Sequence, residues 1–271
     1  MTREAGAERR VTEHFDGDRL DTSVWLPHYL PAWSSRAATA ASYEVRDSCL
    51  HLRIPPGHPL WLPGEHEPPL RVSGLQSGNV SGPVGGTRGQ QPPFAGALVR
   101  EEQPGFWGWT PRFGHLELRA RMVLNPTSMA AWWMVGREID PRESAEICVV
   151  EVFGRSVDPG RSAEVGTGLH QFRDPRVPED FSAPRLELDV AEFHTYAVDW
   201  SADRVTFLVD DRPIRSCPSP PTYPLQHMLA VFDFPTTCDD TDQLRDAPVG
   251  AAPELVVDYL TVEPARDGGA A

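Results

Sequence analysis

Apolar residues recur at every second position in four separate stretches of the chain, and this alternation is the strongest constraint on its fold. The stretches are YEVRDSCLHLRI (43–54), GHLELRARMVL (114–124), HTYAVDWSADRVTFLVDDRPIRS (194–216) and ELVVDYLTVEP (254–264). A spacing of two places successive side chains on opposite faces of a β-strand, so each stretch predicts strands with one buried face. The 28 prolines and 22 glycines fall mostly between these runs, where turns are needed. The sequence therefore predicts an all-β fold, a two-sheet β-sandwich or jelly roll.

The domain organisation follows from length and composition. The 271 residues suit one large β-domain, and neither an internal repeat nor a shift in composition marks a boundary. We expect a single β-jelly-roll domain over residues 11–264. Residues 1–10 are expected to be frayed or disordered, and residues 265–271 to form a frayed tail.

The segment 55–94 is rich in Pro, Gly and Ser and is longer than an ordinary connection between strands. Trp61, Leu70 and Leu75 give it apolar side chains with which to pack. We therefore interpret it as an ordered rim loop, with a floppy insertion as the alternative.

The net charge limits the classes of partner. A formal charge of −14 argues against nucleic acid and anionic membranes, because phosphate binding needs clustered cations. The N-terminus lacks the apolar core of a secretory signal, and no stretch approaches membrane-spanning length. The localisation stays unknown: cytoplasmic as written, secreted if a leader has been removed. We expect a monomer.

The four cysteines lie at positions 49, 148, 217 and 238, without the close Cys or His spacing of a zinc site. A structural zinc is therefore not expected. Cys217 and Cys238 could form a disulfide if the chain is exported.

The stretch EICVVE (146–151) places two glutamates inside an apolar run that is typical of a buried strand. In a flat strand, Glu146 and Glu151 would point to opposite faces. One extra residue at Val149-Val150, a β-bulge, would bring both acids to the same face. With the bulge, one face carries Glu146, Cys148, Glu151 and Phe153, and the core face carries Ile147, Val152 and one of the two valines.

Two acids on one enclosed face suggest a chemistry. Burial and mutual repulsion would raise the pKa of at least one carboxyl, leaving one acid protonated beside an ionised one. Glycoside hydrolysis needs this pair, since one carboxylate attacks the sugar while the other carboxyl protonates the departing oxygen. The alternative is that one acid is exposed at a strand end or paired with an Arg.

The sequence resembles glycoside hydrolase family 16, the laminarinase, lichenase and carrageenase group with a concanavalin-like β-jelly roll. The family signature is Glu-x-Asp-x-x-Glu, and EICVVE matches it at both glutamates. The resemblance covers nearly the whole chain except 55–94. In order, the other similar segments are FDGDRLDTSVW (15–25) as the opening strand, YEVRDSCLHLRI (43–54), RFGHLELRARM (112–122), AAWWMVG (130–136), FHTYAVDWSADRVTFLVDDRPI (193–214) and LVVDYLTVE (255–263) as the closing strand.

The resemblance implies a retaining mechanism, with Glu146 as nucleophile and Glu151 as general acid/base. It implies a polysaccharide or oligosaccharide substrate, of the β-1,3- or β-1,3/1,4-glucan type, and no required cofactor. A structural calcium on the convex face is also implied, with Asp258 as one ligand.

Four aromatic or imidazole side chains are candidates for substrate binding by the same resemblance. Trp133 would form a sugar-stacking floor, or else pack in the core while adjacent Trp132 occupies the other face. His170 would line the site, or else be a structural histidine bonded to the backbone. Trp107 and Trp109 would be sugar platforms, or else a satellite cluster under the segment 55–94.

Cys148 stands where the family signature has its aspartate. A thiol is a weak donor that is ordinarily neutral, with a pKa of about 8.5. Losing one charge from the cluster would lower the pKa of Glu151 relative to the family and weaken it as an acid near neutral pH. Cys148 then has a modified role in hydrolysis, marks a fold put to another use, or is itself a nucleophile.

Three functions are therefore compared. The first is a retaining endo-β-glycosidase, favoured because both glutamates are present. The second is a non-hydrolytic carbohydrate-binding protein, favoured by Cys148. The third is an intracellular enzyme using the same two acids on a small metabolite, which requires the segment 55–94 to close the ends of the site.

Overall fold

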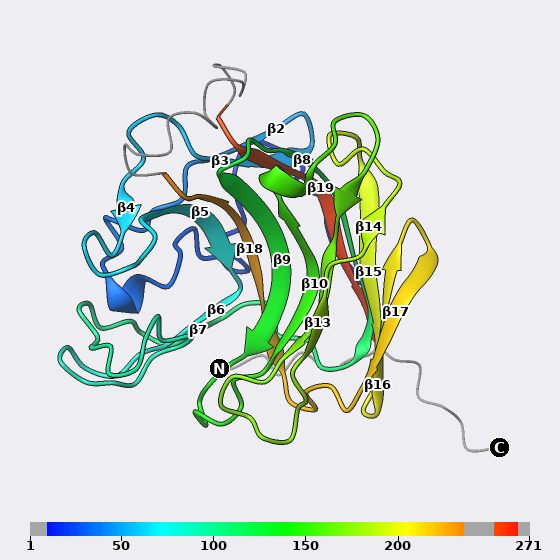
Figure 1. Ribbon diagram of the computed structural model, residues 1–271. Helices are drawn as coiled ribbons and strands as arrows, with labels where there is room; N and C mark the ends of the chain where they lie inside the picture. The colour runs from blue at the N-terminus through cyan, green and yellow to red at the C-terminus, as the bar shows by residue number, and fades with distance from the viewer. Residues whose placement is uncertain (1–9, 236–251, 265–271) are drawn as a thin grey trace.

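The computed structural model describes residues 10–235 and 252–264, and most of the strands among them lie in two large antiparallel sheets (Figure 1). The eight-stranded sheet of the described residues contains β1 (Val11–Glu13), β2 (Tyr43–Arg46), β3 (Cys49–Arg53), β8 (Gly114–Val123), β15 (His194–Trp200), β16 (Arg204–Val209), β17 (Arg212–Pro218) and β19 (Glu254–Glu263). Its order is β17, β16, β15, β8, β19, β3, β2, with β1 also paired to β19.

The second large sheet has seven strands among the described residues: β4 (Leu60–Trp61), β5 (Leu70–Gln76), β9 (Ser128–Gly136), β10 (Glu146–Phe153), β12 (Gly166–His170), β13 (Asp180–Ser182) and β18 (Leu225–Asp233). Its order is β13, β12, β10, β9, β18, β5, β4. The remaining elements are short: β6 (Gly78–Asn79) pairs with β7 (Phe106–Trp107), β11 (Ala163–Glu164) pairs with β14 (Arg185–Leu186), and two 3-10 turns cover Pro31–Trp33 and Gly154–Ser156.

The two large sheets form two layers (Figure 1), and the apolar side chains between them make up what we call the main core. In strand β8, buried and partly exposed residues alternate strictly, as the spacing of its apolar residues predicts for a strand with one buried face. Its inward side chains are fully buried in the main core: Leu116, Leu118, Ala120 and Met122. The predicted two-sheet β-sandwich is therefore confirmed.

A second apolar cluster lies on the other face of the seven-stranded sheet, and we call it the outer-face cluster. The loop and turn around Pro31–Trp33 and the segment 97–99 pack over the strands there. Its buried members are Leu30, Ala32, Trp33, Trp61, Leu62, Leu70, Val72, Ala97, Val99, Met129, Ala131, Trp133, Val135, Cys148, Met228, Ala230 and Phe232. Strand β9 is buried on both faces as a result, which accounts for the continuous apolar run AAWWMVG.

The strands predicted within 194–216 are confirmed, and they form a hairpin that a third strand extends. Strands β15 and β16 pair from Tyr196 to Trp200, and a turn at Asp210-Asp211 leads into β17. Both aspartates have positive φ angles, 48° and 61°, as a tight hairpin turn requires. Pro213 lies within β17, at the edge of the sheet, where a strand tolerates the missing backbone donor.

Two expectations from the sequence are corrected. The segment 55–94 is not one rim loop, because β5 lies inside the seven-stranded sheet between β18 and β4. Ser73 and Gly74 interrupt the apolar alternation of this strand, which is buried on both faces, so the pattern was hidden. The expected opening strand at 15–25 is also absent, and β1 at Val11–Glu13 pairs with β19 instead.

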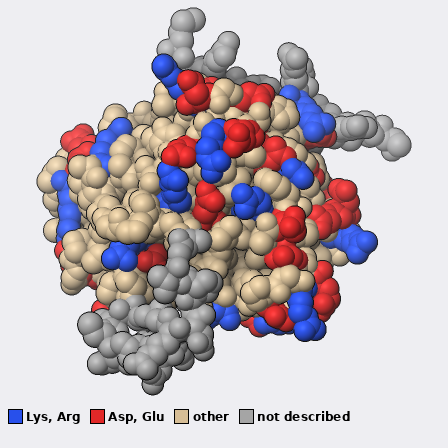
Figure 2. Space-filling view, turned by 90° about the horizontal axis from the view of Figure 1, so that it is seen from above, with Lys and Arg blue, Asp and Glu red and all other residues tan. Residues whose placement is uncertain are grey.

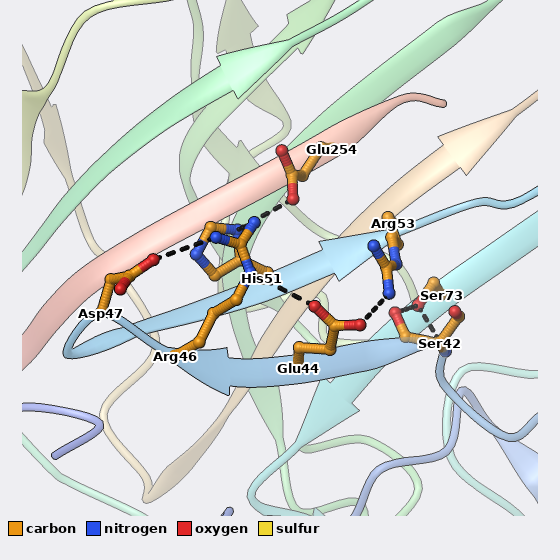
Figure 3. Close-up of polar contacts among 8 residues, drawn as sticks. All are labelled: Ser42, Glu44, Arg46, Asp47, His51, Arg53, Ser73 and Glu254. Carbon is orange, nitrogen blue, oxygen red and sulfur yellow. Dashed lines mark hydrogen bonds and ion pairs between the residues drawn. The ribbon is translucent and has the colours of Figure 1, made fainter. Parts of the chain in front are cut away.

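Polar contacts join the outer side of β2, β3 and β19, as Figure 3 shows. His51 contacts Glu254 over 2.8 Å, and Arg46 donates to Glu44 over 3.2 Å. In the same view, the Ser73 hydroxyl of β5 accepts a hydrogen bond from the Ser42 N–H over 2.9 Å. The same hydroxyl donates to the Ser42 carbonyl over 3.0 Å. Ser73 and Ser42 therefore link an edge of the first sheet to the second.

Charges of both signs are mixed on the surface. On the face seen in Figure 2, arginines lie among aspartates and glutamates rather than in one positive area. Within residues 10–235 and 252–264, no helix is long and apolar enough to cross a membrane. The predicted frayed ends, apart from Arg10, and Cys238 lie outside the described residues, so the disulfide between Cys217 and Cys238 stays a prediction; Cys217 is buried.

Candidate active site

Strand β10 carries a β-bulge at the predicted position. Cys148 lies opposite Trp133 of β9, while Val150 lies opposite Trp132, so Val149 is the extra residue. Strand β12 pairs with the same segment and also shifts register between Cys148 and Glu151. An extra residue reverses the facing of everything that follows it, which is what the two acids need in order to share a face.

The bulge places Glu146 and Glu151 on the outer face of the seven-stranded sheet. Residues directly opposite in an antiparallel ladder share a face, and the partners of the acids on β9 are Val135 and Ala131. Both partners belong to the outer-face cluster. On the inner face, Ile147 and Val152 lie in the main core as predicted, together with both valines, Val149 and Val150, rather than one.

Glu146 is the more deeply placed acid, with 8% of its surface exposed. Burial raises the pKa of its carboxyl well above the ordinary value, and repulsion from Glu151 adds to the shift. One side chain opposes this shift: the Gln91 amide donates a hydrogen bond to the Glu146 Oε2 over 3.1 Å.

Glu151 is partly exposed, and burial raises its pKa as well. The charges of His170 and Arg155 act in the other direction and favour the ionised form. Both acids therefore keep a proton to higher pH than an exposed glutamate does, and two neighbouring carboxyls with raised pKa values are suited to acid/base work.

Cys148 lies between the two acids on the same face and is 1% exposed. Burial raises the pKa of its thiol well above the ordinary value, and the charges of Glu151 and Glu146 raise it further. The thiol is therefore held neutral, which disfavours the reading of Cys148 as a nucleophile.

The two tryptophans of β9 point to opposite faces, as predicted. Trp132 lies in the main core, where its ring stacks on His227 at 6.0 Å between centroids. Trp133 lies on the face of the acids and is 6% exposed. Its ring contacts Phe232 at 6.0 Å and Tyr29 at 6.5 Å, so it is packed in this cluster, and its role as a sugar-stacking floor stays a prediction.

His170 lies directly opposite Glu146 across β10 and β12. Its Nδ1 contacts the Glu179 carboxylate over 2.6 Å, and its ring stacks on Phe181 at 4.8 Å. It is thus held by a carboxylate rather than by the backbone. At the other end of β12, Gly166 lies opposite Glu151. A Cβ atom at Gly166 would lie 3.3 Å from the Glu151 Cβ and 2.6 Å from the Phe181 ring. The glycine therefore allows the Phe181 ring to pack beside Glu151.

The two tryptophans of GFWGW are separated. Trp107 is in β7, half-buried, and the guanidinium of Arg137 lies 4.3 Å above its ring. Arg137 follows directly after β9, at the end where Glu146 lies. Trp109 packs against the main core, with its ring 6.3 Å from Trp25, rather than joining the outer-face cluster. Trp109 is partly buried there, and its role as a sugar platform stays a prediction.

Sequence reasoning missed a group of polar residues beside Glu146. Gln91 comes from the segment 77–105, and its backbone N–H donates to the Glu138 Oε1 over 2.8 Å. Glu138 follows β9, is 4% exposed and is paired with Arg173. Burial raises the pKa of Glu138 to about 7, although the Gln91 N–H and Arg173 favour its ionised form. No local pattern marks Gln91, because its contact with Glu146 spans 55 positions.

Asp258 lies on β19, on the first sheet, and its carboxylate is paired with the guanidinium of Arg119. A cation at this carboxylate would have to compete with that guanidinium. Among the described residues, no group of three or more His, Cys, Asp and Glu side chains is arranged to hold a metal ion. The structural calcium with Asp258 as one ligand therefore stays a prediction.

Solved structures with the same fold are numerous. A GlcNAcα1-4Gal-releasing endo-β-galactosidase from Clostridium perfringens is similar over 96% of this chain, with a TM-score of 0.74 and 22% identity; this chain spans 63% of its length. A laminarinase from Flavobacterium sp. UMI-01 has a TM-score of 0.58 and 18% identity, over 93% of this chain and 98% of that one.

The laminarinase catalytic domain from Thermotoga maritima MSB8 is also similar, with a TM-score of 0.61 and 15% identity, over 95% of this chain and 98% of that one. At these identities the likeness establishes the fold. Among curated proteins, the sequence has no match.

The family model described as Glycosyl hydrolases family 16 matches residues 110–236. This range contains β8, β9, the bulged strand β10 and both of its glutamates. The match of residues 110–236 to glycosyl hydrolase family 16 agrees with the resemblance that EICVVE had indicated.

Proposed function

We propose that this protein is a retaining endo-β-glycosidase that hydrolyses β-1,3- or β-1,3/1,4-glucan. The observation that carries the proposal is the β-bulge at Val149, which puts Glu146 and Glu151 on one face of β10 with Cys148 between them. Without the extra residue, one acid would be buried in the main core and no pair would exist.

The two acids divide the reaction between them. The ionised carboxylate of Glu146 attacks the anomeric carbon, while protonated Glu151 gives its proton to the departing glycosidic oxygen. A covalent glycosyl ester on Glu146 results. Glu151, now ionised, takes a proton from water, whose oxygen attacks the same carbon and releases Glu146 with retention of configuration.

The resting protonation of the pair shapes the rate. Burial favours a proton on Glu146 more strongly than on Glu151, whereas the attack needs Glu146 ionised and Glu151 protonated. The Gln91 amide supports the ionised form of Glu146, and His170 supports the ionised form of Glu151. Turnover therefore requires a pH at which Glu146 has lost its proton while Glu151 keeps its own, which predicts a bell-shaped pH–rate profile.

A β-galactoside is the second candidate substrate. The structural likeness to the endo-β-galactosidase, with a TM-score of 0.74, is higher than that to the laminarinases, at 0.58 and 0.61. The likeness concerns the fold, so the linkage has to be measured. The test therefore includes both kinds of polymer.

Two other functions remain as outcomes of the same test. A carbohydrate-binding protein without turnover is supported by the neutral thiol at Cys148, which leaves no third carboxyl between the acids. An enzyme for a small metabolite is supported by the contact of Gln91 with Glu146, since it brings the segment 77–105 against one acid.

The experiment measures reducing-sugar release from a β-1,3-glucan, a mixed-linkage β-1,3/1,4-glucan and a β-galactan. The wild type is expected to release oligosaccharides from one of them, initially as the β-anomer by proton NMR. Glu146→Gln should abolish release, whereas Glu192→Gln, the same change on an exposed residue, should not.

Absence of release from every polymer would contradict the proposal. Oligosaccharide binding without release would favour the binding protein, and cleavage of small aryl glycosides alone would favour the small-metabolite enzyme. An α-anomer as first product would contradict retention.

A further inference from the structure

The residue that holds Glu146 in place comes from a distant segment and is not part of the bulged strand. Within the described residues, the side chain that hydrogen-bonds Glu146 is Gln91, over 3.1 Å. We infer that Gln91 is a positioning residue that stabilises the ionised form of the Glu146 carboxylate and orients it for attack, while it links that carboxylate to the Trp133 ring. The inference rests on the proposed function, in which Glu146 is the nucleophile.

The orientation of the Gln91 amide follows from its second partner. The indole Nε1 of Trp133 can only donate, and it lies 3.4 Å from the Gln91 Oε1. The amide oxygen therefore faces Trp133, and the NH2 group faces Glu146. A donor to an ionised carboxylate stabilises the charged form and fixes the direction of its lone pairs.

The backbone of Gln91 is held as firmly as its side chain. Its N–H donates to the buried carboxylate of Glu138, which Arg173 pairs from the other side. The neighbouring Gln90 donates to the Arg137 carbonyl over 3.1 Å and accepts from the Trp33 indole over 2.7 Å. The segment around Gln91 is thus fastened to the end of β9, so its amide meets Glu146 in a fixed geometry.

The surroundings of Glu146 show why one donor matters. Acidic groups raise the pKa of Glu146 from three directions: Glu151 on β10, Glu179 before β13 and Glu138 after β9. The other groups near it are the neutral thiol of Cys148, the Tyr29 phenol and His170 on β12, whose Nδ1 is engaged with Glu179. Gln91 is the contact that lowers the pKa of Glu146 against this field.

The first variant is Gln91→Leu, which keeps the size of the side chain and removes the donor. On the acid side of the pH–rate profile, kcat/KM should fall by about tenfold, since a hydrogen bond to a charged group of ordinary strength is lost. The two profiles should converge at higher pH, where Glu146 is ionised in both proteins.

The matched variant is Gln90→Leu, which disturbs the same segment without touching Glu146. It should lower thermal stability and leave the acid limb of the profile in place. If Gln91→Leu lowers kcat/KM equally at every pH, or if both variants move the limb equally, Gln91 has only a structural role and the inference fails.

Cys148→Asp provides a rescue test, because it puts a carboxyl on the same face between the two acids. A protonated carboxyl there can donate to Glu146, so the gain in kcat/KM should be larger in the Gln91→Leu background than in the wild type. If Cys148→Asp changes kcat/KM by the same factor in the wild type and in the Gln91→Leu background, Gln91 does not act as the donor to Glu146, and the inference is contradicted.

A titration independent of turnover separates this inference from the proposed function. The Glu146 carboxyl is followed by 13C NMR in glutamate-labelled protein, with Glu146→Gln to assign the signal. Gln91→Leu should raise the pKa of Glu146 whether or not any polymer is cleaved. An unmoved titration with normal hydrolysis in the wild type overturns the inference alone; a moved titration without hydrolysis overturns only the proposed function.

Discussion

Cys148 and Trp133 lie directly opposite each other across β10 and β9, and both belong to the outer-face cluster. The thiol is shielded and its pKa is raised, so little thiolate is present at pH 8. We predict that iodoacetamide labels Cys49, which is partly exposed, well before Cys148 in the native protein. Peptide mass spectrometry over time measures both rates. Fast labelling of Cys148 with loss of activity would instead support Cys148 as a nucleophile.

Replacing His170 should shift the alkaline side of the pH–rate profile. His170 lowers the pKa of Glu151, and Glu151 must be protonated to act as the acid. His170→Gln removes that charge and raises the pKa of Glu151, so the basic limb of the profile moves to higher pH. At pH values above the basic limb of the wild type, the variant should be about threefold more active. Phe172→Leu, on the exposed neighbour of His170, is the control and should leave the limb in place. A basic limb that moves to lower pH contradicts the prediction.

Glu151→Gln should discriminate between leaving groups. A polysaccharide needs its departing oxygen protonated, so its hydrolysis should fall by roughly 10² to 10⁴-fold. An aryl glycoside with an acidic phenol leaves without a proton, so its first step should be nearly unaffected. Burst kinetics with the two substrates measure the difference. Equal losses on both substrates would assign Glu151 another role.

The stability of the fold should decrease as the pH rises through the raised pKa of Glu138. Burial raises that pKa from 4.5 to about 7, so the folded state binds a proton that the unfolded state has released. The contribution is fully present below pH 4.5 and is lost as pH approaches 7, by about 3 kcal/mol.

Glu138→Gln removes this titration and should flatten the curve by that amount. Denaturant unfolding at several pH values measures it, and the slope is compared rather than the absolute stability, since the contact with Arg173 also changes. Glu146 and Glu151 contribute with the same sign, so some slope should remain. An unchanged slope in Glu138→Gln would show that its carboxyl is ionised throughout.

Deleting Val149 should remove the bulge. The residues after it would reverse their facing, and Glu151 would enter the main core, at a cost of several kcal/mol. Val149→Ala keeps the residue count and should cost only about 1 to 3 kcal/mol, with activity retained. Thermal unfolding of both variants measures the contrast. A deletion variant that folds with wild-type stability would show that the strand can realign.

The fold and the pair of acids were predictable because they depend on local pattern. The apolar alternation of β8 and the odd separation of Glu146 and Glu151 are both visible in the sequence, and the bulge is the simplest way to reconcile the second with a buried strand. The spacing of residues along one strand indicates which face of the sheet each side chain occupies.

The rest depends on contacts between distant segments. Strand β5 was missed because burial on both faces removes alternation, and Gln91 was missed because it meets Glu146 across the fold. Trp107 and Trp109 were predicted to act together, as sugar platforms or as a satellite cluster, yet Trp109 packs on Trp25 while Trp107 lies under Arg137. Proximity along the chain did not determine which of the two rings would join the main core.

Strand β9 serves two purposes at alternate positions. Ala130, Trp132 and Met134 face the main core, whereas Ala131, Trp133 and Val135 face the side of the acids. Substitutions at the first three positions affect the stability of the fold. Substitutions at the other three affect both the stability of the fold and the fit of a sugar. Directed evolution for a new substrate should therefore randomise every second codon of this strand and leave the codons between them fixed.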